Sequence, residues 1–368
     1  MTASSPDAKI HVAYCTDLAY VQHVGVALAS LLEHNAPENV CVHVVSPPLP
    51  AESIARLDSV AASYGTQLDY VAVDASVVAS LREHMHISRA MYYRILLPRL
   101  MPALDKVIYF DCDMVMEADI GELWAIDLEG WGCAGVDEGN PVQTRRLGLD
   151  DDLYINSGTL VMNLAYWREH RVAERCMQWL ADNEAIAILP DQDAINVVLH
   201  HRKKTLPLKW NLNPVPLEDL GVLATYPSRV IHFGGPIKPW HLHYDFELQA
   251  IYRKYLDKTP WAAEFKLAEP ANVAQALIVA NQCHERGHLA LAAQYYVRAL
   301  QFRLQTTKLE SELLLDVLNS AHRLSNSQRY DEATALYRAC FKQWGLPVQH
   351  QVNIYRVPGL LTPLPLAA

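Results

Sequence analysis

The chain has 368 residues, of which 51% are apolar and 20% charged, and its formal net charge is −10. This composition predicts a folded globular protein with room for one large domain and a smaller one, and it excludes a disordered chain. The acidic balance argues against nonspecific nucleic-acid binding, which needs a basic face.

Short apolar strands alternate with helical segments along the first two thirds of the chain. Strands are predicted at 10–14, 40–45, 68–73, 106–110, 160–163 and 230–233, and helices at 24–32, 51–64, 91–100, 172–183 and 193–200. This alternation is typical of an α/β fold with a mostly parallel sheet and helices on both faces.

Beyond residues 264–272 glycine is scarce and helical spacing dominates. Tyr296 and Ala299 recur as Tyr337 and Cys340, at an offset of 41 residues. This echo resembles the helical hairpins of tetratricopeptide (TPR) repeats, but their usual period is about 34 residues, so an ordinary helical bundle is an equal alternative. We predict an α/β domain over residues 1–265, a helical, TPR-like or bundle-like accessory region over 266–345, and an irregular Pro- and Leu-rich tail over 346–368.

Two carboxylates follow the strand predicted at 106–110. Side chains two residues apart in a strand share a face, so Asp111 and Asp113 project together while Cys112 points elsewhere. A divalent cation relieves their repulsion, and hard oxygen ligands suit Mn²⁺ or Mg²⁺ with positions left for phosphate oxygens. Open α/β sheets also bind ligands at the carboxyl ends of strands. The pattern predicts a metal–diphosphate site, although Asp-x-Asp alone is a weak signal.

Three further segments carry candidate chemistry. His232, near the end of its strand, is a candidate third metal ligand, and Gly235 and Lys238 after it suit an approaching phosphate. The segment Asn156-Ser157-Gly158 precedes the strand predicted at 160–163, where a polar turn is the ordinary explanation. The segment Asp191-Gln192-Asp193 opens a helix, and helix capping explains at most Asp193. The polar segment 137–152 is a candidate acceptor lid.

In order along the chain, these motifs resemble family 8 glycosyltransferases, the group of glycogenin and the lipooligosaccharide galactosyltransferases. The resemblance covers roughly residues 10–265 and rests on Cys15-Thr16-Asp17, His86-Ile87-Ser88 with Arg94, Asp111-Cys112-Asp113, Asn156-Ser157-Gly158, Asp191-Gln192-Asp193 and the segment from His232 to Trp240. It implies a GT-A fold and a retaining hexosyltransferase (EC 2.4.1.-) that moves glucose or galactose from a UDP-sugar to a glycan, glycolipid or protein acceptor.

The resemblance also implies a role for each matching residue. Asp111, Asp113 and His232 would bind Mn²⁺, with Mg²⁺ as the alternative. His86 would lie on the acceptor side. The donor would contact Cys112 between the two carboxylates, Ala13, Asp17 and Ile87 at the nucleoside, Gly235 and Lys238 at the diphosphate, and Arg94, Asn156, Gly158, Asp191 and Gln192 around the sugar.

Asp191 and Gln192 are the catalytic candidates, because they match positions on the back face of the donor sugar. A carboxamide is a weak nucleophile, so front-face attack with Gln192 stabilising the oxocarbenium-like centre is preferred to double displacement. The metal and Lys238 would neutralise the leaving diphosphate. Two alternatives stay open: a haloacid dehalogenase-type phosphatase with Asp111 as nucleophile, and a UDP-binding pseudo-glycosyltransferase scaffold.

The remaining features concern location and partners. Seven scattered cysteines without a Cys-x-x-Cys pair are typical of reduced thiols rather than of disulfides or a zinc site. Residues 1–9 lack the apolar stretch of a signal peptide, and no apolar run approaches about 20 residues. We therefore expect a cytoplasmic protein without a transmembrane segment, either free or peripheral at the inner face of a membrane. The C-terminal helices would contact an acceptor or a protein partner.

Overall fold

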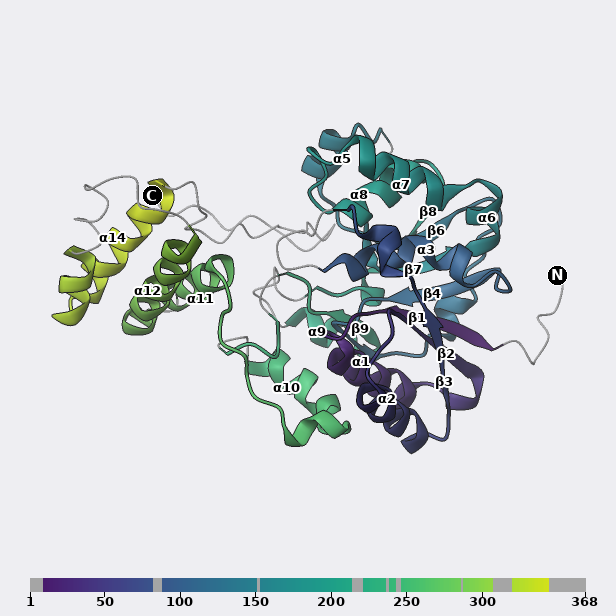
Figure 1. The fold of residues 1–368 in the computed structure, drawn as a ribbon, viewed down its shortest axis with the longest axis horizontal. Coiled ribbons are helices and arrows are strands. Elements are labelled where there is room, and N and C mark those ends of the chain that lie inside the picture. Colours follow the sequence, from purple (N-terminus) through teal and green to yellow (C-terminus); the bar gives the residue numbers. More distant parts are fainter. Residues whose placement is uncertain are drawn as a thin grey trace. The chain divides into compact units, whose positions relative to one another are not determined.

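A computed structural model describes residues 9–81, 88–150, 153–213, 221–235, 238–242, 246–285, 287–306 and 320–343 of the chain (Figure 1). These residues form two compact units. Among the described residues, the first unit comprises 9–233 and Ile251–Phe265, and the second comprises Gly234–Ala250 and the residues from Lys266 onward.

The first unit is built on a seven-stranded sheet with the strand order β3-β2-β1-β4-β7-β6-β8. Neighbouring strands are parallel except at β7, which is antiparallel to both β4 and β6. This confirms the predicted mostly parallel sheet. The strands are β1 (Ile10–Cys15), β2 (Val40–Ser46), β3 (Leu68–Ala72), β4 (Lys106–Phe110), β6 (Cys133–Asp137), β7 (Ile155–Asn163) and β8 (Lys203–Leu206).

A small second sheet lies beyond the carboxyl end of β4. It pairs β5 (Met114–Glu117) with β9 (Arg229–His232) in antiparallel fashion, and Met114 is opposite His232. This pairing brings β9 next to Asp111 and Asp113, which lie between β4 and β5 in the chain.

Helices cover both faces of the large sheet. One face carries a buried apolar cluster in which Val107 and Met162 of the sheet pack with Ile95, Cys176 and Ile195 of the helices. On the other side α1 packs against α2 and β5. The helices of this unit are α1 (Val21–His34), α2 (Ala51–Ser63), α3 (Tyr93–Leu100), α4 (Gly121–Trp124), α5 (Pro141–Leu147), α6 (Leu164–Glu169), α7 (Val172–Asp182), α8 (Pro190–Val198) and α9 (Gly221–Thr225); α10 (Phe246–Leu256) spans the boundary between the units.

The structure corrects several boundaries. Asn156 and Gly158 lie within β7, not in a turn before it, because this strand begins five residues earlier than predicted. Strands β5, β6 and β8 were not predicted, since they are short and β8 begins with two lysines. The helix predicted at 91–100 starts as a 3-10 turn at Arg89–Tyr92, and α8 begins at Pro190 instead of residue 193.

The second unit contains α11 (Val273–Glu285), α12 (Leu289–Thr306) and α14 (Tyr330–Gln343). α12 packs against both α11 and α14. The Tyr296 hydroxyl donates to Asn281 Oδ1 at 2.6 Å, and the rings of Tyr296 and Tyr337 lie 6.0 Å apart between centroids. The echoed tyrosines are thus core residues of these helices, while a TPR-like arrangement stays a prediction. The predicted tail 346–368 lies outside the described residues.

In the described part of the chain, no helix combines the length and the apolar character needed to cross a bilayer.

Candidate active site

Asp111, Asp113 and His232 converge where β4 and β9 end. His232 Nε2 lies 3.7 Å from Asp111 Oδ2 and 3.4 Å from Asp113 Oδ1. The side chains of Asp113 and His232 are largely buried, and that of Asp111 is one-fifth exposed. The structure therefore brings together the three metal ligands that the resemblance implied, in the partly accessible space beyond the sheet.

Gly158 makes this convergence sterically possible. Its carbonyl accepts a hydrogen bond from the Asp111 amide at 2.8 Å. A Cβ atom at this position would lie 2.6 Å from His232 Cε1 and 2.8 Å from Met114 Cε. Glycine is needed here for close packing of β7 against the histidine ring, and any larger residue would displace a candidate metal ligand.

A relay of hydrogen bonds fixes the orientation of His232. Glu138 Oε1 accepts from Asn156 Nδ2 at 2.7 Å, so the amide oxygen of Asn156 faces the other way and accepts from Asn211 Nδ2 at 2.7 Å. The Asn211 oxygen then faces His232 Nδ1 at 2.9 Å. Because a carboxylate only accepts, this order makes His232 Nδ1 a donor and leaves the Nε2 lone pair directed at the carboxylates.

Arg94 of α3 links the carboxylate pair to Asp191. Its Nη2 lies 2.8 Å from Asp111 Oδ1, and its Nε lies 3.2 Å from Asp191 Oδ2. Tyr109 also donates to Asp111 Oδ1 at 2.6 Å. Burial acts to lower the pKa of Arg94, but Asp111 and Asp191 outweigh it and raise that pKa, so the guanidinium stays charged. One oxygen of Asp111 is thus held by Arg94 and Tyr109, while the other faces His232.

Asp191 and Gln192 lie in the first turn of α8 and are both buried. Gln192 Oε1 accepts from the Ser157 amide at 2.9 Å, and its Nε2 donates to Glu138 Oε1 at 3.0 Å. Burial raises the pKa of Asp191, with the Arg94 charge opposing this, and burial also raises the pKa of Glu138. Glu138 therefore positions both Gln192 and, through the relay, His232.

The three candidate ligands Asp111, Asp113 and His232 fit a hard divalent cation. Ligand atoms on neighbouring positions of an octahedral Mg²⁺- or Mn²⁺-type site lie about 3 Å apart, since each bond is about 2.1 Å. The observed separations of 3.4 and 3.7 Å need only small side-chain movements to reach that value. Two carboxylates and one neutral imidazole would balance the formal +2 charge of the ion and leave coordination positions at which it could act as a Lewis acid on diphosphate oxygens.

The other predicted residues are distributed differently. Ala13 is fully buried within β1, and the Cys112 thiol faces the Cys15 carbonyl at 3.1 Å, away from the carboxylates. Asp17 caps the turn after β1 by accepting from the amides of Ala19 and Tyr20. Gly235 and Lys238 belong to the second unit, so their role at a diphosphate stays a prediction. His86 and Ile87 lie outside the described residues.

Sequence reasoning missed Glu138, Asn211, Ser157 and Tyr109 as members of this network. Glu138 falls in the segment predicted as an acceptor lid, yet this residue is only 5% exposed, and its carboxylate accepts hydrogen bonds from Asn156 and Gln192. A signal was present, because Asp137 and Glu138 follow the apolar run 133–136 as Asp111 follows 107–110. Asn211 carries no such local signal.

The fold is that of a glycosyltransferase of the GT-A type. The profile described as Glycosyl transferase family 8 matches residues 11–243, and the chain belongs to this family. This membership leaves no support for the dehalogenase-type phosphatase alternative.

Similar proteins come from several bacteria. General stress protein A of Bacillus subtilis (strain 168) is 27% identical over 273 residues, covering 69% of this chain and 96% of that protein. The lipopolysaccharide 1,2-glucosyltransferase of Escherichia coli (strain K12) is 26% identical, covering 68% of this chain and 79% of that enzyme. The lipopolysaccharide 1,3-galactosyltransferase of Salmonella typhimurium is 25% identical, covering 80% and 92%. The solved structure of the galactosyltransferase LgtC with donor and acceptor sugar analogs has the same fold, with a TM-score of 0.61 and 21% identity over 69% of this chain and all of that one.

Proposed function

We propose that this chain is a retaining hexosyltransferase that moves glucose or galactose from a UDP-sugar to a glycan or glycolipid acceptor with the help of Mn²⁺. The observation that carries the proposal is the convergence of Asp111, Asp113 and His232 next to the Arg94–Asp191–Gln192 network, within a family 8 domain. The carboxylate–histidine cluster alone would be an ion site, and the Arg94–Asp191–Gln192 network alone would be a buried polar network. Together, the cluster would bind a diphosphate through the ion, and the network beside it would offer polar groups to a sugar.

Asp111, Asp113 and His232 would hold the ion, which supplies Lewis-acid stabilisation of the leaving diphosphate when bound. Mg²⁺ satisfies the same ligand chemistry and is the alternative. Lys238, in the segment after β9, is the proposed second positive charge on the diphosphate.

The sugar end of the site favours front-face attack over double displacement. The Asp191 carboxylate is engaged by Arg94 Nε and Ser157 Oγ at 3.2 Å each, an arrangement that stabilises its charge and lowers its nucleophilicity. Gln192 is held by the Ser157 amide and Glu138, so its carboxamide dipole is fixed in advance. We infer that Gln192 stabilises positive charge at the anomeric carbon while the acceptor hydroxyl attacks from the side of the leaving diphosphate, which receives the proton.

The relatives support the acceptor class. Two of them are named for transfer of glucose or galactose to lipopolysaccharide, and both resemble this chain over at least two thirds of its length. We propose an acceptor of that chemical kind, a glycan or a glycolipid, at a membrane surface on the cytoplasmic side. The helical unit from Lys266 onward is proposed to contact the acceptor or a protein partner and to take no part in the chemistry.

The decisive experiment is a UDP-release assay across UDP-sugars with Mn²⁺ and no acceptor, because slow donor hydrolysis reports the donor directly. One donor, UDP-glucose or UDP-galactose, is expected to give metal-dependent UDP release. UDP binding by calorimetry without hydrolysis or transfer would instead support a pseudo-glycosyltransferase scaffold. Release that persists in EDTA would contradict the metal-dependent mechanism.

A further inference from the structure

A second group of metal-ligating side chains lies near the amino ends of β1 and β2. The parallel register places His11 beside Cys41, and His43 is two residues further along β2. Side chains two apart in a strand share a face, so Cys41 and His43 both project toward the side on which His11 lies. One ligand atom from each of the three residues lies within 4.8 Å of the others.

Asp69 holds His43 in the orientation that a metal ligand requires. Its Oδ2 is 2.7 Å from His43 Nδ1, and β3 places Asp69 directly beside His43 in the register. An ionised carboxylate only accepts, so Nδ1 carries the hydrogen and Nε2 keeps its lone pair. A carboxylate behind a histidine is the supporting arrangement that metal-bound histidines commonly have.

The two imidazoles face each other through nitrogen atoms that a metal ion could share. His43 Nε2 lies 2.9 Å from His11 Nδ1, and the rings stack with centroids 5.2 Å apart. A single hydrogen now lies between these nitrogens. Two nitrogens on a tetrahedral Zn²⁺ lie about 3.3 Å apart, given bonds of about 2.0–2.1 Å, so a small rotation of His11 opens the space.

We propose that His11 Nδ1, His43 Nε2 and Cys41 Sγ form a Zn²⁺ site, with water in the fourth position. Two nitrogens and a thiolate are ligands that zinc prefers and that Mn²⁺ and Mg²⁺ do not. Binding releases the thiol proton of Cys41 to water, and the His11 hydrogen moves to Nε2 by exchange with solvent. The charges of the thiolate and of Asp69 then balance the +2 charge of the ion.

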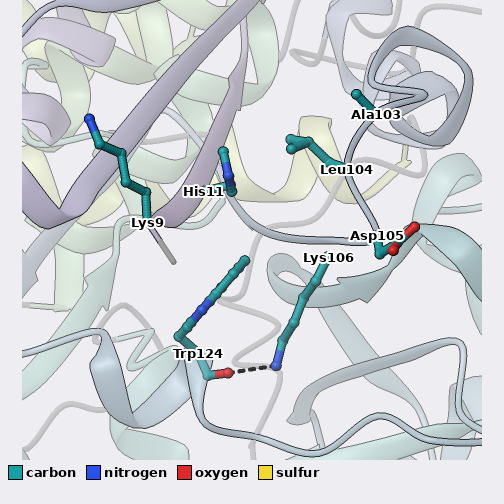
Figure 2. A pocket seen from close by; sticks show the side chains of 7 residues that line it. All are labelled: Lys9, His11, Ala103, Leu104, Asp105, Lys106 and Trp124. Carbon is teal, nitrogen blue, oxygen red and sulfur yellow. Dashed lines mark hydrogen bonds between the residues drawn. The ribbon is translucent and has the colours of Figure 1, made fainter. Parts of the chain in front are cut away.

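The site is open to solvent on the side of His11. This residue lines a cavity of about 430 Å³ together with Lys9, Lys106 and Trp124, and Figure 2 shows its ring among the side chains that line this cavity. Cys41 is partly exposed, while His43 is 5% exposed. An ion can therefore enter without unfolding of the sheet and would be held on its inner side by a rigid, buried histidine.

The site is separate from the donor site. His11 is level with Val107 on β4, as the register of Val12 with Ile108 shows, and Asp111 is four residues further along the chain than Val107. This is about 13 Å along the strands. The ion would cross-link β1 and β2, with Asp69 extending the support to β3, and would stabilise the folded domain by mass action. The cysteine spacing alone did not predict it, because His11 lies 30 residues before Cys41 and only the sheet brings them together.

Cobalt(II) is the direct test, because a cobalt–thiolate bond gives a charge-transfer absorption that oxygen and nitrogen ligands do not give. We would titrate the full chain with Co²⁺ in an Asp113→Asn background, which weakens the donor site, and then displace the cobalt with Zn²⁺. The expected result is one thiolate-ligated Co²⁺ per chain that Zn²⁺ displaces. Asp69→Asn should weaken binding at least tenfold, as loss of a supporting partner does elsewhere.

Matched variants separate this cluster from others. Cys41→Ser should abolish the thiolate band, whereas His200→Asn/His201→Asn should leave it unchanged, although those histidines form another candidate ligand group with Asp150. Thermal melting checks the fold of Cys41→Ser, whose transition should match that of the metal-free parent. His11→Gln is a second variant that keeps the thiol, and it should weaken Co²⁺ binding tenfold or more. Cobalt binding without a thiolate band, a band that persists in Cys41→Ser, or unchanged affinity in His11→Gln would overturn the proposal.

Discussion

The two ends of the central strands carry clusters of titratable side chains with opposite chemistry. At the carboxyl end, Asp111 and Asp113 present oxygen atoms together with His232. At the amino end, His11, Cys41 and His43 present nitrogen and sulfur. The same sheet thus offers a hard-ion site at the edge where open α/β sheets bind ligands and a soft-ion site at the opposite edge.

The difference lies in what supports each cluster. Glu138, Asn156 and Arg94 tie the carboxyl-end cluster into a network that reaches Asp191 and Gln192, so an ion held there would be coupled to the residues proposed to contact the sugar. Among the described residues, the amino-end cluster is supported by Asp69 behind His43 and by the Trp124 ring near His11, neither of which belongs to that network. Metal at the first end should therefore control rate, while metal at the second should control stability.

The strongest contrast is between two aspartates at opposite ends of β4. Asp113→Asn removes an anionic metal ligand and should lower transfer by roughly 10²–10³-fold, a barrier increase of about 3–4 kcal/mol. Asp105→Asn is the matched control, because the Asp105 side chain is exposed and forms an ion pair with Arg168 on the surface. Steady-state transfer with Mn²⁺ measures both, and thermal melting checks the fold. Full activity of Asp113→Asn, or of the parent in EDTA, would remove the metal from the mechanism.

His232→Ala should weaken UDP binding about 10–100-fold in the presence of Mn²⁺ and leave metal-free UDP binding unchanged, because the imidazole acts through the ion. Calorimetric titration of UDP with and without Mn²⁺ provides the measurement. His11→Ala is the control at the other end of the sheet and should change neither titration. An equal loss with and without metal would show that His232 contacts the nucleotide directly.

Glu138 tests whether the hydrogen-bond relay matters for rate. Leucine at this position leaves the amides of Asn156 and Gln192 without their shared acceptor, and kcat should fall about 10-fold or more. Glu138→Gln keeps a carbonyl oxygen that accepts from both amides, so it should retain kcat within a few-fold. Steady-state kinetics of the two variants decides the issue. A Gln variant as slow as the Leu variant would assign the carboxylate charge itself a part in the chemistry.

The donor site was predictable where its signal is local. Asp111 and Asp113 follow an apolar strand, and strand periodicity alone projects them to one side. The polar start of β7 was instead mistaken for a turn, because Asn156 and Ser157 serve the site and hide the strand's apolar pattern. Function here overrides the hydrophobic signal on which strand prediction depends.

Long-range convergence set the other limit. Asn211 reaches His232 because the neighbouring Leu212 pairs with Ile231 of β9, and no spacing in the sequence indicates that pairing. The His11–Cys41–His43 cluster depends in the same way on the register of β1 with β2. Single residues contributed by different strands become a site only when the strand order is known.

Lys106→Met should separate stability from rate at the amino end. Lys106 Nζ donates to the carbonyls of Trp124 and Ile126 at 2.6 Å each, and Figure 2 shows the first of these bonds. Methionine keeps an unbranched stem and removes both hydrogen bonds, so the free energy of unfolding should fall by about 1–3 kcal/mol. Donor hydrolysis should stay within twofold. Urea denaturation and UDP release measure the two effects, and a large loss of rate would couple the two ends of the sheet.

The smallest expected effect is a difference in how stability depends on pH. Burial raises the pKa of Glu138, while the amides of Asn156 and Gln192 oppose this. A carboxyl with a higher pKa in the folded than in the unfolded protein adds stability below its unfolded value, and this contribution is lost as the pH rises through the folded value. The free energy of unfolding of the parent, relative to that of Glu138→Gln, should therefore fall as the pH rises from about 4 toward neutrality. Asp191 is present in both proteins, so its titration cancels.

Urea denaturation at a series of pH values measures the difference, and the comparison of the parent with Lys106→Met should show no such slope, because both of these proteins keep Glu138. A flat or rising difference for Glu138→Gln would mean that the two amides stabilise the Glu138 charge at least as much as burial destabilises it.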